Sequence, residues 1–166
     1  DSLLDYLSEE EIIEEIKINR YMYEHIGEEF GEVYIWKTTP NYDYLSVFVK
    51  TPYVSKDNNY SIHLIRGVKV YEGDNIDRCY EKMKIIEQGI SNEILSITER
   101  QEDSFKHRID PSGKSLVKEI RYIFNTNDRI LIQCTDFEEN LRIKNNWTEG
   151  LSVSIMTYEL YKWFRP

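Results

Sequence analysis

The residue types that could carry nucleophilic or acid–base chemistry are few in this chain and lie far apart. His63 stands in an apolar segment and His107 in a polar one, and either imidazole could act as a base. Cys134 or a serine could act as the nucleophile, with Asp136 close by in the chain. A small hydrolase or transferase with a site near His63, Cys134 and Asp136 is therefore one hypothesis. No nucleophile motif such as G-x-S-x-G supports it, and geometry alone identifies such a triad.

Two further motifs suggest a ligand but lack the residues that would hold it. Residues 111–115 read Pro-Ser-Gly-Lys-Ser and end like a P-loop, but Arg108 stands where that motif needs its first glycine. His25 and Glu28 are three residues apart and could touch one ion, yet a metal site needs more ligands than these. We therefore expect a plain turn at residues 111–115, no metal site and no cofactor.

Aromatic residues are concentrated between residues 34 and 71, in a chain that contains 13 tyrosines. These side chains could pack in the core as cross-strand pairs, or they could form an exposed surface that binds a partner. The second alternative gives the leading hypothesis, a non-catalytic domain that binds a protein or peptide. Its expected binding residues are Tyr34, Trp36, Tyr42 and Tyr44.

The chain has 166 residues and a formal net charge of −9. Its length is typical of one domain, so we expect residues 1–166 to fold as a single domain. The negative charge argues against DNA or RNA as a partner, and it suits either solubility or a basic partner surface. No run of about 18 apolar residues is present, so we expect no membrane span.

The two cysteines both fall on apolar faces of their elements. Cys79 lies on the apolar side of a predicted helix, and Cys134 shares a strand face with Ile130 and Ile132. A helix packed on the sheet could bring the two sulfurs together and close a loop of roughly 55 residues. Two buried thiols are the alternative. A disulfide, together with Asp1 in place of a methionine, favours a periplasmic or secreted protein, whereas free thiols favour the cytoplasm.

Two helices are predicted from capping residues and apolar periodicity. Ser8 and Glu11 fit a capping box, and apolar residues then recur at near-helical spacing over residues 12–30. The second helix is expected over residues 74–97, with Asp74 as its N-cap. A short helix over residues 157–164 closes the chain.

Segments of alternating or continuous apolar character predict six strands, at residues 33–37, 44–49, 60–71, 116–124, 129–134 and 151–155. Residues 99–115 are expected to form a polar loop, and a second polar loop precedes the last strand.

The resulting order is α-β-β-β-α-β-β-β, followed by the short C-terminal helix. Short links between strands favour antiparallel pairing, so the predicted class is α+β with an antiparallel sheet of about six strands and two main helices. The order, length and charge resemble those of acidic secretion chaperones, which are small α+β dimers. The resemblance implies a protein partner and a homodimer. An accessory subunit of a larger assembly is the third functional alternative.

Overall fold

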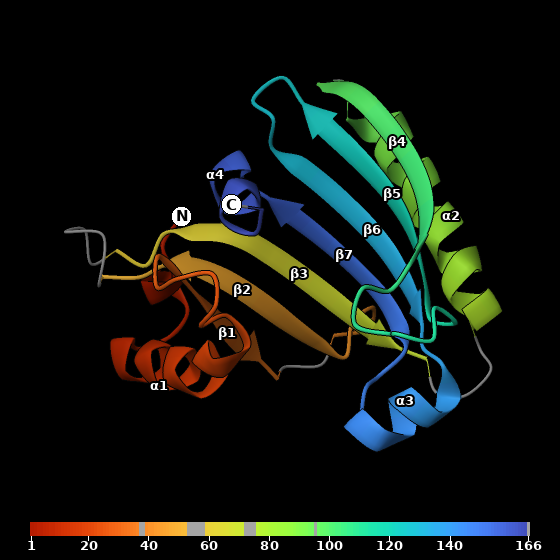
Figure 1. Ribbon diagram of the computed structural model, residues 1–166. Helices are drawn as coiled ribbons and strands as arrows, with labels where there is room; N and C mark the ends of the chain where they lie inside the picture. The colour runs from red at the N-terminus through yellow and green to blue at the C-terminus, as the bar shows by residue number, and fades with distance from the viewer. Residues whose placement is uncertain (37–38, 53–58, 72–75, 95, 166) are drawn as a thin grey trace.

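In the computed structural model, all strands of the described residues belong to one antiparallel sheet (Figure 1). The structure describes residues 1–36, 39–52, 59–71, 76–94 and 96–165. The sheet has seven strands in the order β1-β2-β3-β7-β6-β5-β4. The strands are β1 (Phe30–Ile35), β2 (Tyr44–Lys50), β3 (Ile62–Val70), β4 (Ile97–Lys106), β5 (Leu116–Phe124), β6 (Arg129–Asp136) and β7 (Gly150–Met156). The predicted α+β class with an antiparallel sheet is therefore confirmed.

Four α-helices accompany the sheet in the described residues: α1 (Glu9–Asn19), α2 (Ile76–Glu93), α3 (Glu139–Asn145) and α4 (Tyr158–Trp163). Two short 3-10 helices, η1 (Leu3–Asp5) and η2 (Arg20–Met22), flank α1. The predicted capping box is present, because Ser8 accepts from the backbone of Glu11 while the Glu11 side chain accepts from the backbone of Ser8. None of the described helices is long and apolar enough to cross a membrane.

The two main helices cover the same side of the sheet, which we call the outer face. α1 packs on β1 and β2 through Ile12, Ile16, Val33 and Val47, whereas α2 packs on β5 to β7 through Met83 and neighbouring apolar residues. Burial of these side chains is the main force that holds the helices on the sheet.

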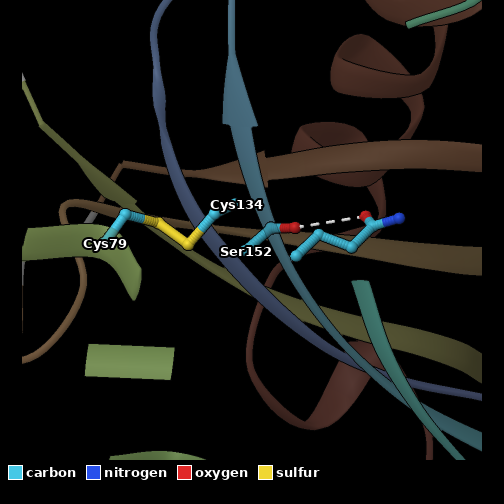
Figure 2. The surroundings of a disulfide bond; sticks show 4 residues. Cys79, Cys134 and Ser152 are labelled. Atoms are coloured by element: carbon cyan, nitrogen blue, oxygen red, sulfur yellow. Dashed lines mark hydrogen bonds between the residues drawn. A yellow bond between two sulfur atoms is a disulfide. The ribbon is translucent and has the colours of Figure 1, made fainter. Parts of the chain in front are cut away.

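A disulfide between Cys79 and Cys134 ties α2 to β6 on the outer face, with a Cα–Cα distance of 6.0 Å (Figure 2). It closes the loop that the spacing of the two cysteines predicts, and no described cysteine is free. Both cysteines are fully buried, so the bridge lies inside the core between α2 and the sheet.

The opposite side of the sheet, which we call the inner face, is covered at one end only. The short helix α4 lies inside the bend of the sheet (Figure 1). Leu160 and Trp163 of α4 pack on Phe48, Leu64 and Met156, which are inner-face residues of β2, β3 and β7. The rest of the inner face is left without a helix in the described part of the chain.

Three parts of the predicted element map are wrong. Residues 97–106 form the edge strand β4 instead of a loop, because a charged edge strand exposed on both sides shows no apolar alternation. Residues 139–145 form α3, with Glu138 as its N-cap, where a loop was expected. The first helix ends at Asn19, and Phe30 is a strand residue, so the helical spacing beyond Asn19 was fortuitous. The predicted N-cap Asp74 lies outside the described residues.

Candidate functional site

A row of mostly polar and aromatic side chains crosses most of the sheet on the inner face. Strand register places these residues side by side: Tyr34 on β1, Ser46 on β2, Arg66 on β3, Ser154 on β7, Leu131 on β6 and Arg121 on β5. Adjacent strands lie about 4.8 Å apart, so the row spans up to roughly 24 Å. Ser46 and Ser154 in this row are buried, at 0% and 4% exposed, so a partner can reach the row only at its less buried members.

A buried ion pair stands at the β1–β3 end of this row. Glu32 is only 1% exposed, and Arg66 donates to it from Nη2. Arg66 Nη2 also donates to Ser46 Oγ over 3.0 Å, and the Ser46 hydroxyl in turn donates to Glu32. Tyr23 completes the set with a 2.7 Å hydrogen bond from its hydroxyl to Glu32. A buried carboxylate needs this degree of pairing, because desolvation of an unpaired charge is very costly.

The same carboxylate perturbs the tyrosines that surround it. Burial, followed by the negative charge of Glu32, raises the pKa of both Tyr23 and Tyr34 well above the ordinary value. Both phenols therefore stay protonated and can donate hydrogen bonds throughout the physiological range. The Arg66 side chain keeps 30% of its surface exposed, while that of Glu32 is fully buried.

Three of the four aromatic residues predicted as binding residues lie together on the inner face. Tyr34 and Trp36 are stacked with ring centroids 5.5 Å apart, and Tyr44 lies 5.0 Å from Trp36 and 5.7 Å from Tyr34. Trp36 is 71% exposed although it belongs to this cluster. Tyr42 lies apart from them, because its ring packs over Gly67, where an added Cβ would come within 2.7 Å of it. Gly67 faces the outer side of β3, so Tyr42 serves packing there.

An open pocket of about 310 Å³ lies beside the aromatic cluster. Tyr34, Tyr44 and Arg66 form one wall, and Thr135, Thr148 and Ser152 contribute hydroxyl groups. Ser152 donates a 3.4 Å hydrogen bond to Gln133, drawn as a dashed line in Figure 2, on the side of the sheet away from the disulfide. The pocket thus combines aromatic rings with hydrogen-bonding groups, as binding sites for peptides and small molecules commonly do.

A second buried carboxylate lies further along the inner face. Glu119 of β5 is 4% exposed and accepts from Arg121 and, over 2.6 Å, from Gln133 Nε2. Arg121 Nη1 also donates to Gln101 Oε1 over 3.0 Å. The inner face therefore holds two buried carboxylate–arginine pairs, one on each half of the sheet.

The residues expected for a hydrolase do not come together. Cys134 is bonded to Cys79 and has no free thiol, and Asp136 follows it at the end of β6. Strand register places Cys134 level with Lys69, six residues along β3 from His63. That separation is roughly 20 Å.

His63 does take part in another arrangement, near α4. Its Nδ1 lies 3.0 Å from Thr157 Oγ1 and 3.6 Å from Glu159 Oε2, and its Nε2 lies 3.3 Å from Ser61 Oγ. Burial lowers the pKa of His63, which keeps the imidazole neutral near pH 7. A pocket of about 240 Å³ lies next to His63.

The two weaker motifs form no ligand site in the described residues. Residues 111–115 form a turn held by buried Asp110, whose carboxylate accepts from the backbone of Ser112, Lys114 and Ser115. A strand follows this turn, whereas a P-loop needs a helix there. No group of three or more potential metal ligands is present among the described residues.

Sequence reasoning missed the charged part of the site. Glu32 and Arg66 stand inside strongly apolar strands, and a charge at such a position signals a buried pair. The alternation of β1 to β3 places both on the face of Tyr34 and Tyr44, so this signal was available. Which carboxylate meets which arginine depends on strand order, which the sequence does not show.

The fold and this site together define an α+β protein whose outer face carries the two main helices and whose inner face carries buried ion pairs and an aromatic cluster beside β1 and β2. The chain matches no family model, no curated protein and no solved structure in the comparisons made.

Proposed function

We propose that this protein is a non-catalytic interaction domain that binds a protein or peptide partner on the inner face. The observation that carries the proposal is Trp36, an indole that is 71% exposed yet stacked on Tyr34, whose ring lines an open pocket. Rigid aromatic side chains of this kind often supply the energetic centre of an interface. The adjacent Arg66 and hydroxyl groups supply directional hydrogen bonds.

The other properties of the partner follow from charge and chemistry. A chain with a net charge of −9 is unsuited to nucleic acid and is suited to a neutral or basic partner surface. A second copy of this chain and a larger assembly in which it is an accessory subunit are both compatible with the same face. The disulfide favours an oxidising compartment, so we extend the proposal to a periplasmic or secreted location.

The test is native mass spectrometry of the tagged protein isolated from its source, in which partner retention is compared between Trp36→Ala and Tyr21→Ala. Tyr21 is 72% exposed and lies in η2, outside the sheet, so it is a matched control for the loss of an exposed aromatic ring. We expect Trp36→Ala to lose the partner and Tyr21→Ala to keep it. Equal retention by the two variants, or no partner on the unmutated protein, would contradict the proposal.

A second candidate function, a small hydrolase, is favoured by the contacts of His63. In the tautomer that carries its hydrogen on Nδ1, directed at Thr157 or Glu159, Nε2 accepts from the Ser61 hydroxyl, which is the arrangement of an activated serine. The site would consist of Ser61 as nucleophile and His63 as base.

A fluorophosphonate probe tests this candidate directly, because it labels activated serines. Labelling that is lost in Ser61→Ala and His63→Gln but kept in Ser104→Ala, a change at an exposed serine, would establish it. Absence of labelling on the unmutated protein would exclude the hydrolase. The interaction domain would then be the only proposed function.

A further inference from the structure

Two arginines lie over the ring of Tyr161 at the end of the inner face that α4 covers. The Arg129 guanidinium carbon lies 3.2 Å from the Tyr161 ring centroid, and that of Arg165 lies 5.0 Å from it. Arg129 pairs across the sheet with Ile123, so Arg121 is its diagonal neighbour on β5. The cluster thus draws on two strands and on the residues that follow α4.

The positive charge of this cluster is only partly balanced. Arg121 is paired with Glu119, whereas neither Arg129 nor Arg165 has an ion pair among the described residues. Arg129 is 9% exposed, and its Nε and Nη1 have no hydrogen-bond partner in the described part of the chain. Buried donors of a charged group are costly to leave without an acceptor.

Tyr161 reports the local electrostatic field. Burial acts to raise its pKa, but a hydrogen bond from Arg129 and the charges of Arg129, Arg165 and Arg121 lower it below the ordinary value. The direction of this shift agrees with the arginines placed around the ring.

We propose that Arg129, Arg165 and the Tyr161 hydroxyl form an oxyanion site that binds a carboxylate group. The unpaired donors of Arg129 supply hydrogen bonds to its oxygens, and the exposed Arg165, whose guanidinium carbon lies 5.0 Å from the same ring, supplies a second positive charge. A carboxylate suits this site better than phosphate, because desolvation of a dianion costs more than that of a monoanion. The carboxylate belongs either to a free acid or to an acidic side chain of a bound protein.

The test uses acetate and the isolated, isotopically labelled protein. Acetate is titrated against chloride at equal ionic strength while NMR follows the Arg129 Nε–H signal and the pKa of Tyr161. We expect a saturable shift of the Arg129 signal and a rise in the Tyr161 pKa, because a bound anion disfavours the phenolate. No saturable shift, or tighter binding of inorganic phosphate than of acetate, overturns the proposal.

Two variants make the test specific. Arg165→Gln changes an exposed side chain beyond α4 and is expected to weaken acetate binding about three- to tenfold without unfolding the protein. Arg20→Gln removes an exposed arginine that pairs with Glu28 elsewhere, and it is expected to leave acetate binding unchanged. Equal weakening by both variants would show a general charge effect and overturn the site.

Protein isolated from its natural host shows whether the bound carboxylate comes from a partner protein or from a free acid. Loss of a retained partner in Arg165→Gln identifies an acidic side chain of that partner, whereas unchanged retention together with acetate binding identifies a free acid. The acetate result does not depend on a partner, so a failure of the proposed interaction function is distinguishable from a failure of this site.

Discussion

The outer and inner faces of the sheet are made by the same strands but are held by different forces. On β7, Leu151 turns outward into the apolar layer under α2, while the next residue, Ser152, turns inward to Gln133 (Figure 2). Two helices and a disulfide cover the two ends of the outer face, and Ile65 and Ile155 between them are 46% and 60% exposed. The inner face instead buries Glu32 and Glu119 with their arginines. Apolar packing and a disulfide therefore hold the outer face, whereas the inner face adds to its own apolar cluster the polar groups that can recognise another molecule.

The largest effect expected from this comparison is on the outer face. Reduction of the disulfide, or the change of both cysteines to serine, is expected to lower the free energy of unfolding by about 4 kcal/mol, given the separation of 55 residues. Urea denaturation with and without a reductant measures it. A change below about 1 kcal/mol would show that α2 is held by packing alone.

The next effect concerns the ion pair at the β1–β3 end of the inner face. Glu32→Gln leaves Arg66 without its carboxylate and is expected to cost about 3 kcal/mol of stability. Glu102→Gln, which weakens an exposed pair with Arg100, is the control and is expected to cost less than about 1 kcal/mol. Equal urea midpoints for the two variants would mean that the inner-face pair is no more important than a surface one.

A smaller effect, on binding and not on folding, is expected at the rim of the inner face. Trp36→Ala is expected to weaken partner binding by about 2 kcal/mol, which is roughly thirtyfold, because it removes the exposed anchor. Titration calorimetry with the identified partner measures it. If Trp36→Ala also lowered the thermal stability, Trp36 would serve folding and not only binding. The distinction drawn between the two faces would then be wrong.

The smallest effect is a pH dependence. Burial lowers the pKa of His63 and of His107 below 6.5, so the unfolded chain takes up these protons first as the pH falls. Stability is therefore expected to be full above about pH 6.5 and to decline as the pH falls towards the folded-state pKa values. Urea midpoints between about pH 7.5 and 5.5 measure the decline, in a range above the titration of the carboxylates. His63→Gln is expected to reduce the slope, and an unchanged slope would exclude His63 as its source.

Local features of the sequence predicted much of the fold. The capping box at Ser8 and Glu11 marked the start of α1, and the apolar positions of Cys79 and Cys134 permitted the disulfide that the structure contains. β4 and α3 could not be found in this way, because neither shows the apolar periodicity that marks a buried face. Their structure depends on the β5 backbone and on the N-cap at Glu138.

The candidate site was predictable only in part. Tyr34, Trp36 and Tyr44 were found from the concentration of aromatic residues, and strand alternation accounts for their common face. Tyr42 belongs to the same segment of sequence but contacts Gly67 on the other side, where the absence of a side chain admits its ring.

The sequence by itself determined the α+β class, most strands, the starting point of the first helix and the acidic charge, because these depend on periodicity, capping and composition. Only the tertiary structure decided which residues meet across the inner face. Glu32 meets Arg66, and Arg129 meets Tyr161, through the order in which strands pair and the return of α4 over the sheet. Strand order is a long-range property, since it is set by the burial of whole faces rather than by any local spacing of residues.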